Sequence, residues 1–227
     1  MTTTPKPVLF VLTSHGVKGA TGQPTGYYLA EVTHPLAVLE EAGIAVEFAS
    51  IQGGEPPVDG LDLDDTTNAR YWNDAHFREQ VSHTQPLGEV NPTDYSAIFF
   101  AGGHGTMWDF PESPDVQRIT RAIYENNGAV GAVCHGPSAL LNVTLSDGRY
   151  LVAGKRVSAF TDSEERAVQL EGVVPFLLAS ELEKRGADHL PAADWNRQVV
   201  VDGHLVTGQN PQSATAVGEA LRDLVLA

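Results

Sequence analysis

The 227-residue sequence predicts an α/β fold in which a mostly parallel sheet has helices on both faces and carries a late β-hairpin. Three observations support this prediction. Short β-rich runs alternate with helical patterns along the chain. Apolar residues make up 42% of the sequence, enough for a sizeable core, and 22 Gly with 14 Pro suit many strand-to-helix turns. The length favours a single domain over residues 1–227.

The first half of the chain predicts strands at three apolar runs, which are Val8–Leu12, Ile44–Ala49 and Ala97–Ala101. A helix between the first two is indicated by apolar residues at helical spacing, namely Leu29, Val32, Leu36 and Leu39. Pro35 inside that pattern predicts a kink or a restarted helix, and Gly43 ends it. An exposed acidic loop over 52–67 and a helix over 68–82 follow.

The second half begins with a helix whose start is predicted by Ser113 as N-cap and Pro114 at the first helical position. The elements that follow are strands over Ala129–Val133 and Val157–Phe160 and helices over Pro137–Val143, Val174–Arg185 and Ser213–Leu226. Asp202-Gly203 predicts a two-residue hairpin turn. It joins two β-rich runs, Gln198–Val201 and His204–Thr207.

Charge and targeting patterns exclude several classes of partner. The formal charge is -15, and the four lysines are scattered, so the positive surface that nucleic acids or anionic membranes require is missing. The first apolar run is five residues long, too short for a signal peptide or a membrane span. Cys134 is the one cysteine and cannot form an internal disulfide, so we expect a cytoplasmic location.

A ligand site is expected beyond the carboxyl ends of the parallel strands. Three irregular segments follow strands there: the loop after Leu12, the run 102–105 (Gly-Gly-His-Gly) and the run 134–136 (Cys-His-Gly). We expect these segments to meet in one crevice.

Cys134 is the candidate nucleophile of this crevice. It stands between a strand and a helix start, where backbone amides and the helix dipole favour a thiolate. Most free cysteines are small buried hydrophobes, so the position alone leaves a packing role open. His135 is a candidate general base, or a residue that only stabilises the turn. Its amide and that of Gly103 could form an oxyanion hole.

Several acids could assist the base. Three carboxylates follow the strand-like run ending at Phe160: Asp162, Glu164 and Glu165. The residues alone do not decide which of them faces His135. Glu31 lies on the first helix among apolar residues, where its pKa would be raised and where it could exchange protons; an ordinary surface Glu is the alternative. His104, between glycines, could line the same pocket.

Metal and nucleotide sites are not indicated. The eight histidines include neither His-Glu-x-x-His nor His-x-His, and the glycines match neither a Walker A loop nor G-x-G-x-x-G. We therefore expect no metal and no cofactor.

Four motifs in order, together with Glu31, resemble the ThiJ/PfpI superfamily. They are Ala101-Gly-Gly-His-Gly-Thr106, Ala132-Val-Cys-His-Gly-Pro137, Phe160-Thr-Asp-Ser-Glu-Glu165 and Thr207-Gly-Gln-Asn-Pro211. The chain is most similar to the single-domain, heat-shock-associated glyoxalase III and chaperone branch. Thr25-Gly26 before Glu31 and His34-Pro35 after it fit that branch. The resemblance runs from about residue 7 to the C-terminus.

The resemblance implies a flavodoxin-like three-layer α/β sandwich with the class I glutamine amidotransferase-like architecture. It also implies Cys134 as nucleophile, His135 and Glu165 as its partners, Glu31 as the acid beside the thiol, and oxyanion amides from Gly103 and His135. The implied reaction is glutathione-independent conversion of methylglyoxal, a small ketoaldehyde, to lactate through a cysteine hemithioacetal. A homodimer is the implied assembly, and no external cofactor is needed.

Other functions use the same residues. Amidotransfer is disfavoured because no histidine has Glu two residues later. Cysteine peptidase or protein deglycase activity would use the same thiol. A holdase chaperone or a thiol redox sensor is the non-enzymatic alternative.

Overall fold

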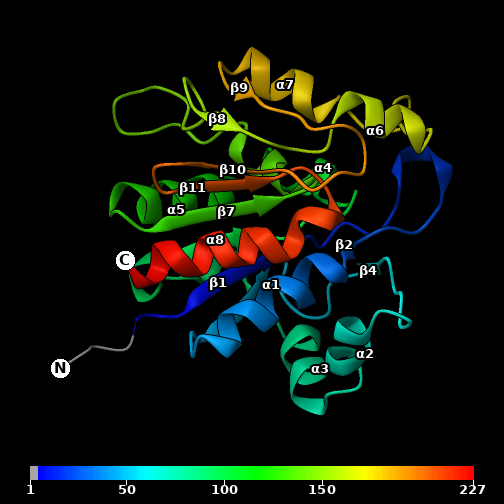
Figure 1. The fold of residues 1–227 in the computed structure, drawn as a ribbon, viewed down its shortest axis with the longest axis vertical. Helices are drawn as coiled ribbons and strands as arrows, with labels where there is room; N and C mark the ends of the chain where they lie inside the picture. The colour runs from blue at the N-terminus through cyan, green and yellow to red at the C-terminus, as the bar shows by residue number, and fades with distance from the viewer. Residues whose placement is uncertain (1–4) are drawn as a thin grey trace.

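A computed structural model describes residues 5–227 and contains a seven-stranded sheet in the order β10-β11-β7-β6-β1-β3-β5 (Figure 1). The strands are β1 (Val8–Leu12), β3 (Val46–Ser50), β5 (Gln85–Pro86), β6 (Ala97–Phe100), β7 (Ala129–Val133), β10 (Val199–Asp202) and β11 (Leu205–Gly208). Neighbouring strands are parallel except β10 and β11, which form the predicted hairpin across Asp202 and Gly203. The predicted mostly parallel sheet is confirmed.

Helices cover both faces of the sheet, as predicted for a three-layer α/β sandwich. α1 (Ala30–Glu41) and α8 (Ala214–Leu226) lie side by side on one face, and α5 (Pro114–Glu125) lies on the other (Figure 1). A glycine permits the close contact between α1 and α8, because a Cβ on Gly218 would lie 2.7 Å from Cα of Pro35.

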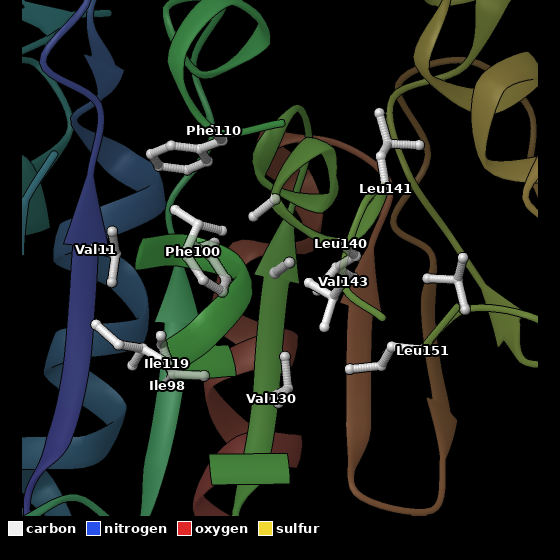
Figure 2. Close-up of a cluster of buried hydrophobic side chains, with 14 of the residues drawn as sticks. Val11, Ile98, Phe100, Phe110, Ile119, Val130, Leu140, Leu141, Val143 and Leu151 are labelled. Atoms are coloured by element: carbon white, nitrogen blue, oxygen red, sulfur yellow. The ribbon is translucent and has the colours of Figure 1, made fainter. Parts of the chain in front are cut away.

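The apolar strands are explained by burial on both faces. Along β1, alternate residues enter different core clusters: Val8, Phe10 and Leu12 face α1 and α8, whereas Leu9 and Val11 face α5. Figure 2 shows the α5 side, where Val11 packs with side chains of β6, β7 and α5. This double burial makes the sheet a rigid base for the loops that follow its strands.

Shorter elements surround this frame. They are β2 (Tyr27–Tyr28), β4 (Val58–Asp59), α2 (Thr66–Trp72), α3 (Ala75–Ser82), α4 (Thr106–Asp109), β8 (Arg156–Val157), α6 (Asp162–Ala167), α7 (Leu178–Lys184) and β9 (Asp188–His189). Short 3-10 helices occur at Gly19–Thr21, Leu87–Glu89, Pro92–Asp94, Gly136–Leu140 and Pro211–Ser213. Within residues 5–227, no helix combines the length and the apolar character needed to cross a bilayer.

The structure corrects one helix prediction in the first half and narrows another. The helix expected over 68–82 is two helices, because the Asp74 side chain accepts hydrogen bonds from the amides of His76 and Phe77 and starts a new helix there. Of the two alternatives expected at Pro35, a kink or a restarted helix, the restart is excluded, because α1 is one continuous helix from Ala30 to Glu41.

Three further predictions need new boundaries. The helix expected over 174–185 begins only at Leu178, after Pro175, and the one expected over 137–143 is the 3-10 helix Gly136–Leu140. The strand expected over 157–160 is β8, which pairs with β9 in a separate small sheet. Beyond it the chain turns toward β7, since the amide of Phe160 donates to the carbonyl of Cys134 at 2.9 Å.

Candidate active site

The three irregular segments meet in one cavity, as the sequence predicted. The cavity has a volume of about 380 Å³ and lies at the carboxyl ends of β1, β6 and β7. Its lining residues are Lys18, Gln23, Tyr28, Asp59, Gly103, His104, Cys134, His135, Phe160, Val168, Leu170, Trp195 and Pro211. No sequence motif indicated Lys18 or Asp59, which are distant in the chain and form an ion pair at 3.5 Å.

Cys134 stands at a sharp turn between β7 and the following 3-10 helix. Its φ of 60° lies in the left-handed region, which a non-glycine residue adopts only at a cost in free energy. Glycines make the turn possible: a Cβ on Gly136 would lie 2.3 Å from the carbonyl oxygen of Phe100, and one on Gly102 would lie 2.9 Å from Cβ of Cys134. The turn holds the nearly buried thiol at the wall of the cavity.

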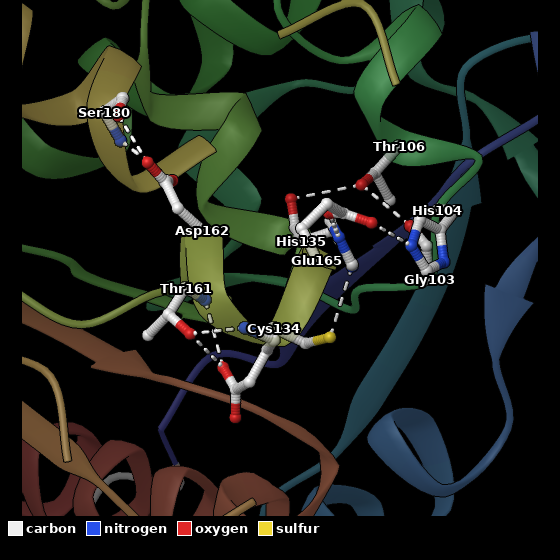
Figure 3. Close-up of polar contacts among 10 residues, drawn as sticks. Gly103, His104, Thr106, Cys134, His135, Thr161, Asp162, Glu165 and Ser180 are labelled. Atoms are coloured by element: carbon white, nitrogen blue, oxygen red, sulfur yellow. Dashed lines mark hydrogen bonds and ion pairs between the residues drawn. The ribbon is translucent and has the colours of Figure 1, made fainter. Parts of the chain in front are cut away.

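His135 and Glu165 form a chain of contacts that ends at this thiol (Figure 3). Nδ1 of His135 lies 3.3 Å from Sγ of Cys134, and Nε2 lies 2.8 Å from Oε2 of Glu165. An ionised carboxylate only accepts hydrogen bonds, so Nε2 carries the proton and Nδ1 presents its lone pair to the thiol. Burial, reinforced by His104, lowers the pKa of His135 to about 4, so the ring is neutral at pH 7.

The adjacent acids Glu164 and Glu165 face different partners. Burial opposes ionisation of Glu165, but hydrogen bonds from His104 and His135 outweigh it and lower the pKa of this carboxyl to about 2. Glu164 is fully buried, and none of its hydrogen-bond partners is a histidine. Its carboxylate accepts hydrogen bonds from the amides of Thr161 and Trp195, the Thr161 hydroxyl and the side-chain amides of Gln209 and Asn210.

The third acid of that segment, Asp162, faces elsewhere: its Oδ2 accepts a hydrogen bond from the Ser180 hydroxyl. Of the three carboxylates that the sequence left as alternatives, the structure brings only Glu165 to His135.

Glu31 is buried in α1 beside the thiol. Neither carboxyl oxygen has a hydrogen-bond partner of good geometry among residues 5–227. Burial raises the pKa of Glu31 to about 8, although the Cys134 thiol and the Gly102 amide lie close enough to oppose the increase. The predicted rise is confirmed, and Glu31 holds a proton at neutral pH.

In the site, the structure corrects the prediction that Cys134 is a thiolate. Burial, together with the neighbouring Glu31, raises the pKa of Cys134 well above its usual range, while the His135 amide opposes the shift only in part. The helix start after Cys134 is a short 3-10 turn, and its amides do not compensate for the loss of water. The resting residue is therefore a thiol, next to a neutral imidazole that can accept its proton.

Gly103 brings its backbone to the cavity wall. Its φ is 103°, and a Cβ there would lie 2.2 Å from the Gly26 carbonyl oxygen, so only glycine fits. The Gly103 amide has no protein acceptor in the part of the chain that the structure describes. It lines the same cavity as His135, whose own amide lies next to the Cys134 sulfur.

His104 has a contact with Glu165 that its sequence neighbours did not indicate. It lines the cavity, as expected, but its Nε2 also lies 2.8 Å from Oε1 of Glu165, and its ring centroid is 4.1 Å from that of His135. One donor atom from each of His104, His135 and Glu165 lies within 4.8 Å of the others, a spacing that could hold a metal ion. A metal there would have to replace both hydrogen-bonded protons.

Comparison with known proteins gives a consistent result. The family model described as DJ-1/PfpI family matches residues 24–223. The chain is 34% identical to "Glutathione-independent glyoxalase HSP31" of Saccharomyces cerevisiae, with 92% of this chain and 94% of that protein covered. It is 31% identical to "Glyoxalase 3" of Candida albicans, with 93% and 95% covered.

Solved structures are similar over the same length. Glyoxalase III from Candida albicans superposes with a TM-score of 0.89 at 30% identity, covering 96% of this chain and 97% of that one. Rapid Encystment Protein 24 kDa of Francisella tularensis gives a TM-score of 0.94 at 39% identity, covering 97% and 99%.

Proposed function

This chain belongs to the DJ-1/PfpI family, and from that premise we propose that it is a glutathione-independent glyoxalase, which converts methylglyoxal and water to lactate. The observation that carries the proposal is the contact of one thiol with a neutral imidazole and, on its other side, the closeness of the same thiol to a protonated carboxyl group that is buried behind the cavity. A 2-oxoaldehyde needs these three functions: a nucleophile for its aldehyde carbon, a base for the thiol proton and an acid for oxygen.

The first step is addition of Cys134 to the aldehyde carbon, C1. The S–C1 bond forms, the thiol proton passes to Nδ1 of His135, and the carbonyl electron pair moves onto oxygen O1. Amides of Gly103 and His135 stabilise the developing negative charge, and O1 then takes the proton from the imidazolium. Glu165 keeps the ring in the tautomer that this transfer requires.

The hemithioacetal then becomes a thioester through an enediol. The C1 hydrogen leaves as a proton and C2 gains a proton, while the oxygen on C2 gains a proton and O1 loses one, so that the carbons exchange oxidation states without an external redox partner. Glu31 supplies and recovers the proton at oxygen, because its pKa of about 8 keeps it protonated at rest. Water hydrolyses the thioester to lactate and restores the thiol.

The test is proton NMR of methylglyoxal with purified protein and no glutathione. We expect a lactate signal from the unmodified protein and none from Cys134→Ala. A folded protein with a reduced thiol that makes no lactate would refute the proposal.

The non-enzymatic alternatives have less support. A thiol redox sensor requires an accessible sulfur with a lowered pKa, whereas Cys134 is 4% exposed and its pKa is raised. We also propose a cytoplasmic homodimer, from the lone cysteine and the family resemblance; light scattering that gives the monomer mass would refute the dimer.

A further inference from the structure

Glu165 holds two imidazoles, not one. Its Oε1 accepts from Nε2 of His104 and its Oε2 from Nε2 of His135, each at 2.8 Å, and the two rings are tilted by 41° with centroids 4.1 Å apart (Figure 3). Because the carboxylate accepts both protons, each ring keeps Nδ1 free as a potential base.

The two free nitrogens face different surroundings. Nδ1 of His135 is buried against the Cys134 sulfur. The His104 side chain is 15% exposed and lines the cavity, and within residues 5–227 its one hydrogen bond is the contact with Glu165. The cavity therefore has an oriented imidazole ring whose second nitrogen has no role in the steps of the proposed reaction given above.

The proposed reaction still lacks a group that removes the proton from C1. Glu31 already holds a proton at neutral pH, because its pKa is about 8. Nδ1 of His135 is assigned to the thiol proton. The Asp59 carboxylate is engaged by Lys18 at 3.5 Å and by the hydroxyl of Thr25 at 3.1 Å.

The remaining titratable group on the wall is the phenol of Tyr28. Burial and the nearby acid Glu31 raise the pKa of Tyr28 above its usual 10, so the phenol stays protonated. Among the side chains that line the cavity, this leaves His104 as the unoccupied base.

We propose that His104 is a catalytic residue of this reaction: its Nδ1 takes the C1 proton of the hemithioacetal and returns it to C2. The inference rests on the proposed function. The C1–H bond breaks, its electron pair forms the C1=C2 bond, and the C2 carbonyl pair moves to oxygen, which takes the proton of Glu31. In the second half, O1 returns a proton to Glu31, the C1=C2 pair takes the proton back from His104 at C2, and the thioester carbonyl remains.

Glu165 explains why a histidine suits this role. The imidazolium that forms on His104 is 2.8 Å from a carboxylate that is 3% exposed, so the charge is paired where it develops. Since the same carboxylate also orients His135, both proton transfers depend on one acid.

The test compares His104→Gln with His204→Gln, a control at an exposed histidine. Glutamine can still donate an amide N–H to Glu165 but has no basic nitrogen. We expect kcat for lactate formation to fall at least about 100-fold in His104→Gln and to be unchanged in the control. The rate at which iodoacetamide alkylates Cys134 should be the same in both variants as in the unmodified protein.

A second readout isolates the carbon step. With methylglyoxal deuterated at the aldehyde carbon, the isotope effect on kcat should increase in His104→Gln, because C–H cleavage becomes rate-limiting. His104→Asn should behave alike if the Gln variant does not fold. Normal turnover in either folded variant, or an equal loss of thiol alkylation, would overturn the inference. Failure of the unmodified protein to make lactate would instead reject the proposed function.

Discussion

Replacing Glu165 by Gln should remove catalysis and stability together. Lowering the pKa of Glu165 from 4.5 to about 2 corresponds to about 3 kcal/mol of preference for the ionised form in the folded state. The side chain is 3% exposed, so solvent screens little of this. A lowered pKa gives stability that is present above pH 4.5 and is lost as the pH falls toward 2. At pH 7, Glu165→Gln should therefore melt about 10 °C lower.

The effect on catalysis follows from hydrogen-bond geometry. The Gln amide offers one acceptor oxygen and one N–H group to two imidazoles that both donate at present. If the N–H group faces His135, the ring must turn Nδ1–H toward the sulfur and can no longer accept the thiol proton. We expect kcat/KM for lactate formation, measured by NMR, to fall about 10³–10⁴-fold.

Glu164→Gln is the matched control, because Glu164 is also buried but its hydrogen bonds join the start of α6 to the segments at Trp195 and Gln209–Asn210 and do not involve either histidine. It should lower the melting temperature at least as much, while kcat/KM per folded molecule stays within about three-fold of the unmodified value. Equal catalytic losses in the two variants, or normal turnover in Glu165→Gln, would refute the reasoning.

Three further predictions concern pH, the turn and helix packing. kcat/KM should rise as His135 loses its proton near pH 4 and fall as Glu31 loses its proton near pH 8; a rate still rising well above pH 8 contradicts this. In thermal melts, Cys134→Gly should be about 1 kcal/mol more stable than Cys134→Ala, since glycine adopts a φ of 60° freely; equal stabilities contradict the strain. Gly218→Ala should cost about 1–3 kcal/mol, and Gly172→Ala, with open space, nothing; equal melts contradict the tight helix contact.

The parallel strands were predictable because burial on both faces makes each one a continuous apolar run, as in β1. The helix boundaries were harder to predict. The break between α2 and α3 depends on one side chain, Asp74, whose acceptor position competes with a helical pattern that continues past it. The start of α7 was misplaced for a related reason, because a helical pattern includes Val174 while the proline after it prevents helical backbone there.

The candidate site was predictable where it follows strand ends. Cys134, His135 and Gly103 stand directly after β7 and β6, and the topology brings those ends together. The choice between Glu164 and Glu165 could not be predicted from the residues. Both lie in the first turn of α6, where adjacent side chains point about 100° apart. The residues alone could not say which direction faces the histidines; the family resemblance selected Glu165.

The contrast between Glu31 and Glu165 supports the different roles proposed for the two acids. Both carboxyls are buried, yet Glu31 has no hydrogen-bond donor of good geometry among the described residues and Glu165 has two. Burial therefore raises the pKa of Glu31 to about 8, whereas at Glu165 the hydrogen bonds from the two histidines outweigh burial and lower the pKa to about 2. One acid keeps a proton that it can give to oxygen, and the other keeps a charge that pairs with imidazolium. A site with a thiol at rest can thus add sulfur to a carbonyl without first paying to bury a thiolate.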